Sequence, residues 1–276
     1  MTDVPAFTTR RLERIAEDAL ASAGVLGVLP TPLDALRPVA GIRAVEAMPA
    51  LPERIRTPGR QLLGALWFEE RTIFLEERQS DARRRFTEAH ELMHALCPWH
   101  EAVLREDTSD ELFRSAVDAI EAEANAGAGM LLFQGRHLAA RVAAERPSIS
   151  APLSLAREYG ASAHAALHHY VLTHAAALAM LVVGRFPRRD GSLPVWRSVE
   201  SRRYRQRFDR AAAAMPAGLL PGSPLRELVE AARCASEPAI ARLPWTDPHG
   251  RVRRVRAHAH YNRHAFLVLL ESAGAR

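Results

Sequence analysis

The stretch RRRFTEAHELMHAL, residues 83–96, decides how the fold of this chain is interpreted. It holds His90 and His94 four residues apart, with Glu91 directly after the first histidine. On a helix this spacing puts both imidazoles on one face, one turn apart, where one metal ion can contact both. Glu91 would then lie beside the metal without binding it, placed to take a proton from a water molecule there. The stretch makes the chain a candidate zinc peptidase.

The residues around the motif predict that it is helical. Apolar residues recur at three- and four-residue spacing, which is typical of an amphipathic helix with one buried face: Phe86, Ala89, Leu92, Met93 and Leu96. Thr87 is the expected N-cap, and Pro98 is expected to end the helix. The alternative is that the two histidines are ordinary surface residues. Two same-face histidines beside an apolar stripe usually need a partner, which favours the metal site.

A catalytic zinc needs a third protein ligand, and a second predicted helix offers one. Residues 108–132, TSDELFRSAVDAIEAEANAGAGMLL, combine good helix formers with apolar periodicity. Glu121 and Asn125 share one face of this helix, and Ile120 and Ala124 lie on the flank expected to pack inward. The competing carboxylates are Asp118 and Glu123. Spacing alone leaves the choice among the three acidic residues open.

The two helical segments together resemble the ImmA/IrrE family of bacterial metallopeptidases, which typically show RFTLAHELGH followed by E-x-x-AN-x-FA-x-x-LLMP. The residues that match the first run are Phe86, Thr87, Ala89, His90, Glu91 and His94, and those that match the second are Glu121, Ala124, Asn125, Leu131 and Leu132. The resemblance implies that His90, His94 and Glu121 bind the metal and that Glu91 is the catalytic base. The chain departs from the family at Gly127-Ala128 and at Phe133-Gln134, positions that shape local packing.

The resemblance also implies a function. It implies a zincin-like, mainly helical, metal-dependent endopeptidase that cleaves a cognate helix-turn-helix repressor and so derepresses stress-response or mobile-element genes in a bacterium. The ligand set accepts Zn2+ or Mn2+. The alternative is a catalytically degenerate peptidase fold that acts as a DNA-binding or ligand-sensing transcription regulator.

The segment before the motif helix predicts a small sheet. Residues 64–77, GALWFEERTIFLEE, are typical of two short strands around a polar turn at residues 69–71. An exposed edge strand there could hold a peptide in extended form through main-chain hydrogen bonds. The alternative is a plain structural hairpin.

Composition indicates a soluble cytoplasmic protein. The sequence contains no apolar run long enough for a membrane span, and its N-terminal residues do not resemble a signal peptide. Two cysteines, Cys97 and Cys234, do not make a disulfide framework. All 37 basic residues are arginine, and their distribution gives residues 1–140 a net charge of −6 and residues 141–276 a net charge of +11. The acidic half suits a cation site, and the basic half could meet a polyanion or an acidic partner.

The expected fold class is α+β, with three parts. Residues 1–147 form the metallopeptidase domain, residues 148–176 a helix-turn-helix-like segment with a glycine turn at Gly160, and residues 177–276 a small α+β domain that could be a GAF-like sensor. Few basic side chains lie on the second helix of the middle segment, which argues against direct DNA binding. Two further interpretations remain open for this segment. One is a second metal site at His164, His168, His169 and His174, and the other is an oxyanion-stabilising group, either one of these histidines or Tyr159.

Strands are expected at two places in the last part. LAMLVVGRF and LPVWRSVES predict a buried strand and its partner, and RVRRVRAHAHYNRHAFLVLLES predicts a hairpin that turns at Asn262-Arg263. Residues 200–242 are expected to be mostly helix and loop. Val252, Val255, Ala257 and Ala259 are expected to face one way, and His258, His260 and His264 to be solvated or paired across strands. The arginine run could bind nucleic acid, although an alternating strand face of arginine is usually only solvated.

Overall fold

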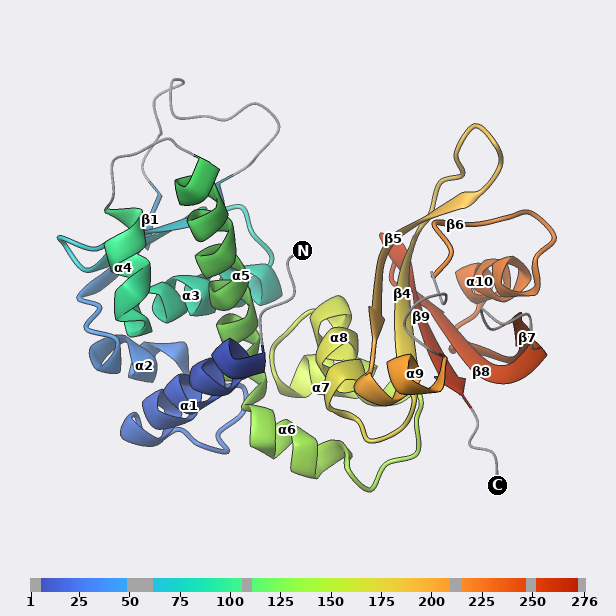
Figure 1. Cartoon of the computed structure of the whole chain (residues 1–276), viewed down its shortest axis with the longest axis horizontal. Coiled ribbons are helices and arrows are strands. Elements are labelled where there is room, and N and C mark those ends of the chain that lie inside the picture. The colour runs from blue at the N-terminus through green and yellow to red at the C-terminus, as the bar shows by residue number, and fades with distance from the viewer. Residues whose placement is uncertain (1–5, 49–61, 106–110, 209–214, 247–251, 273–276) are drawn as a thin grey trace. The chain divides into compact units, whose positions relative to one another are not determined.

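A computed structural model describes residues 6–48, 62–105, 111–208, 215–246 and 252–272 (Figure 1). The fold is mixed α+β, as predicted. Two compact units are present. The N-terminal unit comprises Met1–His137 with Arg157–Ser162, and the C-terminal unit comprises Leu138–Ala156 with Ala163–Arg276. The expected limits at residues 147 and 176 stay predictions, because these units describe packing alone.

The N-terminal unit combines helices with a three-stranded sheet. Its helices are α1 (Ala6–Ser22), α2 (Leu33–Val39), α3 (Asp81–Leu96), α4 (Pro98–Leu104) and α5 (Glu111–Phe133). Its strands are β1 (Ala44–Ala47), β2 (Gly64–Trp67) and β3 (Thr72–Leu75), in the order β1-β3-β2. Strand β2 pairs with β3 in antiparallel register, so the hairpin predicted around residues 69–71 is confirmed. No neighbour pairs with the outer side of β2 among the described residues, which leaves that side as a sheet edge.

Helix α3 carries the HELMH motif and begins earlier than expected. Ser80 is its N-cap residue, so the prediction of Thr87 as the N-cap is wrong. Asp81 lies in the first turn, where a carboxylate interacts favourably with the helix dipole, and good helix formers precede the apolar stripe. Thr87 instead donates its hydroxyl to the backbone oxygen of Arg83 at 3.0 Å. The helix ends at Leu96, which confirms the expectation that Pro98 ends it.

Helix α5 packs closely against α3. Ile120 and Ala124 are buried, as their positions predicted. A Cβ atom on Gly127 would lie 2.4 Å from Cε of Met93, so the glycine lets the two helices approach. At the end of α5, Gln134 is buried, and its side-chain amide donates to the backbone oxygen of Val28 at 2.9 Å. Gly127 and Gln134, at which the chain departs from the family pattern, therefore both take part in the packing of α5 against its neighbours.

The C-terminal unit is built on a six-stranded sheet in the order β6-β5-β4-β9-β8-β7. Its strands are β4 (Leu178–Gly184), β5 (Leu193–Glu200), β6 (Gly218–Leu219), β7 (Ala239–Thr246), β8 (Val252–Tyr261) and β9 (Ala265–Ser272). The helices from α6 onward are α6 (Gly135–Val142), α7 (Ser150–Glu158), α8 (Ala163–Thr173), α9 (Arg202–Arg207) and α10 (Pro224–Cys234). Gly160 lies between α7 and α8 with φ of +60°, so the predicted helix, glycine turn and helix are present.

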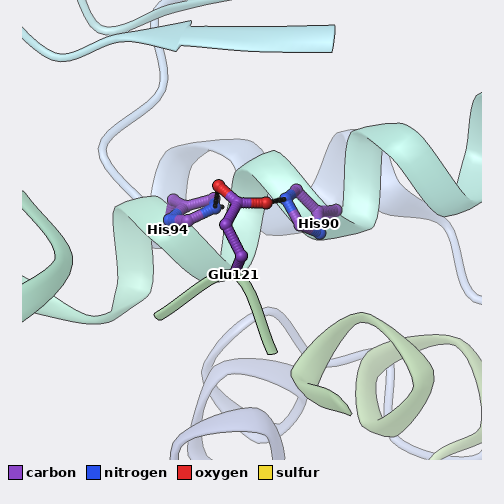
Figure 2. A group of neighbouring side chains, drawn as sticks. All are labelled: His90, His94 and Glu121. Atoms are coloured by element: carbon purple, nitrogen blue, oxygen red, sulfur yellow. Dashed lines mark hydrogen bonds and ion pairs between the residues drawn. The ribbon is translucent and has the colours of Figure 1, made fainter. Parts of the chain in front are cut away.

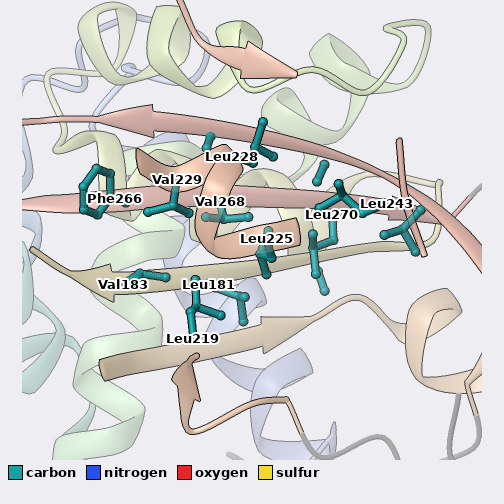
Figure 3. Packing of buried hydrophobic residues seen from close by; sticks show 14 of the residues in the cluster. Leu181, Val183, Leu219, Leu225, Leu228, Val229, Leu243, Phe266, Val268 and Leu270 are labelled. Carbon is teal, nitrogen blue, oxygen red and sulfur yellow. The ribbon is translucent and has the colours of Figure 1, made fainter. Parts of the chain in front are cut away.

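Helix α10 covers one face of this sheet and closes its core (Figure 3). Leu225 and Val229 of α10 are buried in one cluster with Val268 and Leu270 of β9. Strand β4 is buried along its whole length, which confirms the strand predicted there. Strands β8 and β9 pair as the predicted hairpin.

The described residues between 200 and 242 are mostly helix and loop, as expected, but strand β7 begins within this segment at Ala239. Two other expectations for this unit are wrong. Val252 is 68% exposed while Val255 is buried, because residues three apart on a strand point to opposite faces. His258 was expected to be solvated or paired, yet its side chain is buried, and burial lowers its pKa to about 4. None of the helices in the described part of the chain is long and apolar enough to cross a membrane.

Candidate metal centre

Three side chains from two helices meet at one point in the N-terminal unit (Figure 2). His90 and His94 extend from α3, and Glu121 extends from α5. The two histidine Nε2 atoms are 3.1 Å apart. The Glu121 carboxylate reaches both rings, with Oε2 at 3.3 Å from His90 Nε2 and Oε1 at 3.4 Å from His94 Nε2. The residues predicted as ligands therefore form one cluster.

The spacing of these atoms suits a tetrahedral metal ion. Zinc bonds to nitrogen and carboxylate oxygen are about 2.0–2.2 Å long, so two ligands of tetrahedral zinc lie about 3.3 Å apart. The separation of the two Nε2 atoms and the distance from each of them to its nearer Glu121 oxygen all fall near that value. Within the described ranges, this is the one group of three or more histidine, cysteine or acidic side chains that could hold a metal. Neither Asp118 nor Glu123 belongs to it.

The electrostatics of the cluster favour a cation. Hydrogen bonds from His90 and His94 lower the pKa of Glu121, so its carboxylate is ionised. Burial disfavours the charged form of His90, but Glu121, Glu91 and Asn125 outweigh burial and raise its pKa. The Nε2 atoms of His90 and His94 thus face the anionic carboxylate of Glu121. A metal cation bound among them would take the place of the proton that the histidines now share with the carboxylate. A side-chain hydrogen bond with Asn125, the last residue of the EAEAN block, is the smallest of the contributions that raise the pKa of His90.

Glu91 lies beside the cluster and outside the set of candidate ligands. Its side chain is 7% exposed, and burial raises its pKa, although the neighbouring His90 and His94 act in the opposite direction. A hydrogen bond with the backbone of Leu66 on β2 also favours its charged form. A carboxylate whose pKa is raised by burial suits a group that must accept and return a proton.

Strand β2 runs against this part of α3. A Cβ atom on Gly64 would lie 2.4 Å from Cγ2 of Thr87 and 3.0 Å from Oε1 of Glu91. The absence of a side chain at Gly64 therefore lets the strand approach Glu91. The edge strand predicted before the motif helix therefore borders the residue predicted to be the catalytic base.

Replacing Gly64 by alanine should separate β2 from α3. The added methyl group cannot fit against Thr87 without a backbone shift, and overpacking of this kind costs about 1–3 kcal/mol. Urea unfolding of the variant should show that loss of stability. Gly135→Ala is the matched control, because a Cβ atom there meets nothing within 4 Å. Equal stability of Gly64→Ala and wild type would contradict the close approach.

Sequence reasoning missed a chain of hydrogen bonds behind His94. Nδ1 of His94 lies 3.0 Å from Nδ1 of His100, and Nε2 of His100 lies 3.0 Å from Oε2 of Glu123. Trp99 donates its indole N–H to the same oxygen at 2.8 Å. The sequence signal is present, since His100 follows His94 by six residues and Glu123 is one of the three candidate carboxylates. Only the fold shows that Glu123 reaches His100.

The other residues that the sequence offers as metal ligands or oxyanion-stabilising groups lie outside the metal cluster. Cys97 is buried, and burial raises the pKa of its thiol to about 12, which agrees with a residue that fills the core. Tyr159 is also buried, and its hydroxyl lies 3.0 Å from Nδ1 of His137. His168 and His169 belong to the C-terminal unit, where burial lowers the pKa of His168 to about 3 and that of His169 to about 4. The structure brings none of these side chains into the metal cluster.

Comparisons with known proteins agree with the motifs. The family model described as Peptidase M78, IrrE N-terminal-like domain, matches residues 54–170, which include the whole cluster. A Mycobacterium tuberculosis transcriptional regulator is similar in structure, with a TM-score of 0.56 and 18% identity over 95% of this chain and 75% of that chain. At this identity the similarity concerns the fold. No curated protein matches the chain. The match to residues 54–170 therefore supports the resemblance to the ImmA/IrrE family of metallopeptidases that the two sequence motifs carry.

Proposed function

We propose that this chain is a zinc-dependent endopeptidase of the ImmA/IrrE type. The observation that carries the proposal is the convergence of His90, His94 and Glu121 at tetrahedral spacing, with Glu91 beside them. The three residues would hold the ion and leave one position open. Mn2+ could take the same ligands.

The chemistry follows from the positions of these side chains. A zinc ion held there would supply Lewis acidity, which polarises a carbonyl group and makes water more acidic. Glu91 accepts the proton of the attacking water and returns it to the amine that leaves when the peptide bond breaks. Its hydrogen bond with the Leu66 backbone fixes the carboxylate against β2. Burial raises the pKa of Glu91, which increases its affinity for that proton.

The edge of β2 is suited to holding the substrate. An extended peptide can add to a free strand edge through main-chain hydrogen bonds, and Gly64 and Leu66 place that edge beside Glu91. Trp67 on the same strand is 57% exposed and offers an apolar surface to a substrate side chain. A peptide aligned along β2 would therefore present its backbone near the cluster.

The proposed substrate is a cognate helix-turn-helix transcription repressor in the bacterial cytoplasm, whose cleavage derepresses stress-response or mobile-element genes. The match of residues 54–170 to the IrrE N-terminal-like family model supports this substrate. A second function is favoured by one observation, since the similar structure is named a transcriptional regulator. In that case the chain would act as a DNA-binding or ligand-sensing regulator without hydrolysis.

Cleavage of a repressor separates the two functions. The zinc-loaded protein should contain about one metal ion per chain and should cut a helix-turn-helix repressor encoded by a neighbouring gene, as fragments in mass spectrometry would show. A chelator should stop the cleavage, and added Zn2+ should restore it. Specific DNA binding that persists without metal, together with an intact repressor, would favour the regulator.

A further inference from the structure

The ring of His94 has a partner on each side. Its Nε2 atom faces His90 and Glu121, and its Nδ1 atom faces His100 of α4. His100 is completely buried, and its ring leads on to Glu123 of α5. A metal ligand on α3 is thus joined to a carboxylate on α5 through a histidine on α4.

The hydrogen-bond chemistry allows one arrangement of protons when His94 binds a metal through Nε2. A neutral histidine that uses Nε2 as a ligand carries its proton on Nδ1, so His94 must donate to Nδ1 of His100. His100 then carries its own proton on Nε2 and donates it to Glu123. The carboxylate accepts that bond, so the donors and acceptors of the series are matched.

Glu123 is itself held in place. Its Oε2 atom accepts from both Trp99 and His100, and its side chain is only 16% exposed. The guanidinium carbon of Arg11 lies 3.7 Å from the centre of the Trp99 ring, which packs the indole against α1. The carboxylate that ends the series is therefore fixed in position by these contacts.

We propose that His100 and Glu123 are positioning residues that fix the ring orientation and tautomer of His94 for metal binding. The inference rests on the proposed function, because it requires that His94 is a metal ligand. Histidine ligands of metals commonly donate their second N–H to a carboxylate, which makes the ligand more basic. Here His100 lies between the ligand and the carboxylate, so Glu123 affects His94 through the hydrogen bonds of the His100 ring.

The decisive test is the metal affinity of the full chain. His100→Phe keeps an aromatic ring but removes the acceptor, and it should weaken Zn2+ binding about 10–100-fold in competition with a chromophoric chelator. His100→Asn retains an oxygen that can accept from Nδ1 of His94, so it should recover part of the affinity. Glu123→Gln removes the negative charge but keeps an acceptor, so its loss should be smaller.

A spectroscopic readout distinguishes positioning from packing. With Co2+ bound at saturation, His100→Phe should shift the visible absorption bands, because the orientation of the His94 ligand changes. His137→Phe and Asp118→Asn are the matched controls, since they make the same chemical changes at residues outside this series. Both controls should keep the wild-type affinity and spectrum.

Each outcome has one meaning. A wild-type protein that binds no Zn2+ would overturn the proposed function and this inference with it. If the wild type binds Zn2+ and all three variants bind within twofold of it, the proposed function stands and the positioning role is wrong. The same holds if His100→Phe lowers only the melting temperature of the metal-free protein. If that variant does not fold, His100→Asn and Glu123→Gln decide the question by affinity.

Discussion

Glu91→Gln is expected to abolish cleavage while leaving the metal bound. Removing a general base typically lowers the rate about 10²–10⁴-fold. Glutamine cannot accept the proton of water, whereas the candidate ligands on α3 and α5 are untouched. Metal analysis should still find about one ion per chain, and the repressor should stay intact in an assay where the wild type cuts it.

The variant should fold at least as well as the wild type. Burial raises the pKa of Glu91, which means that the fold destabilises its charged form. Glutamine removes that charge and keeps an oxygen that can accept from the Leu66 backbone. Loss of cleavage in this variant would therefore report chemistry and not unfolding.

Glu88→Gln supplies the control on the same helix. Glu88 is buried and pairs with Arg37 at 2.7 Å, so its carboxylate has a structural partner. This variant should lose some stability and keep cleavage. Normal cleavage by Glu91→Gln would show that the proposed mechanism is wrong.

The sequence predicted the part of the site that depends on local spacing. The positions of His90 and His94 on one helix face follow from the four-residue interval, and the structure has them on α3. The choice of Glu121 came from the family resemblance, since spacing left three acidic residues open. Successive helix residues are rotated by about 100°, so Glu121 and Glu123 point in different directions. Which of them faces α3 depends on how α5 is rotated, and Ile120 and Gly127 set that rotation by packing.

The connection through His100 could not be predicted in the same way. It requires the turn between α3 and α4 to bring His100 back against His94, and it requires α5 to present Glu123 there. Both conditions depend on contacts between separate helices, which the spacing of residues along the sequence does not determine. Strand β7 was missed for a related reason: its alternation is weak, and pairing with β8 stabilises it. Strand β4 was found because every one of its residues is apolar or glycine and buried.

Removing the metal is expected to loosen the N-terminal unit and leave the C-terminal unit unchanged. The ion would link His90 and His94 on α3 with Glu121 on α5, so it binds the folded unit and not the unfolded chain. At a metal concentration 1,000 times the dissociation constant, this stabilises the unit by about 4 kcal/mol. For a domain of this size the melting temperature should fall by about 10 °C on chelation.

Amide hydrogen exchange can locate that change in the chain. Exchange should quicken in α3 and α5 when the metal is removed, because the link between them is lost. Protection in β4 and β9 should stay the same, since the described residues of the C-terminal unit hold no comparable cluster. Without the ion, Glu121 still bonds to both histidines, so the helices should loosen and not unfold.

Glu121→Gln is the matched variant for this experiment. It keeps the shape of the side chain but removes the charge that completes the cluster, so chelation should no longer alter its melting temperature or its exchange. The variant without added metal should resemble the chelated wild type, because both lack the same cross-link between α3 and α5. A wild-type protein whose melting temperature and exchange are equal with and without Zn2+ would mean that the cluster does not hold a metal ion that stabilises the fold.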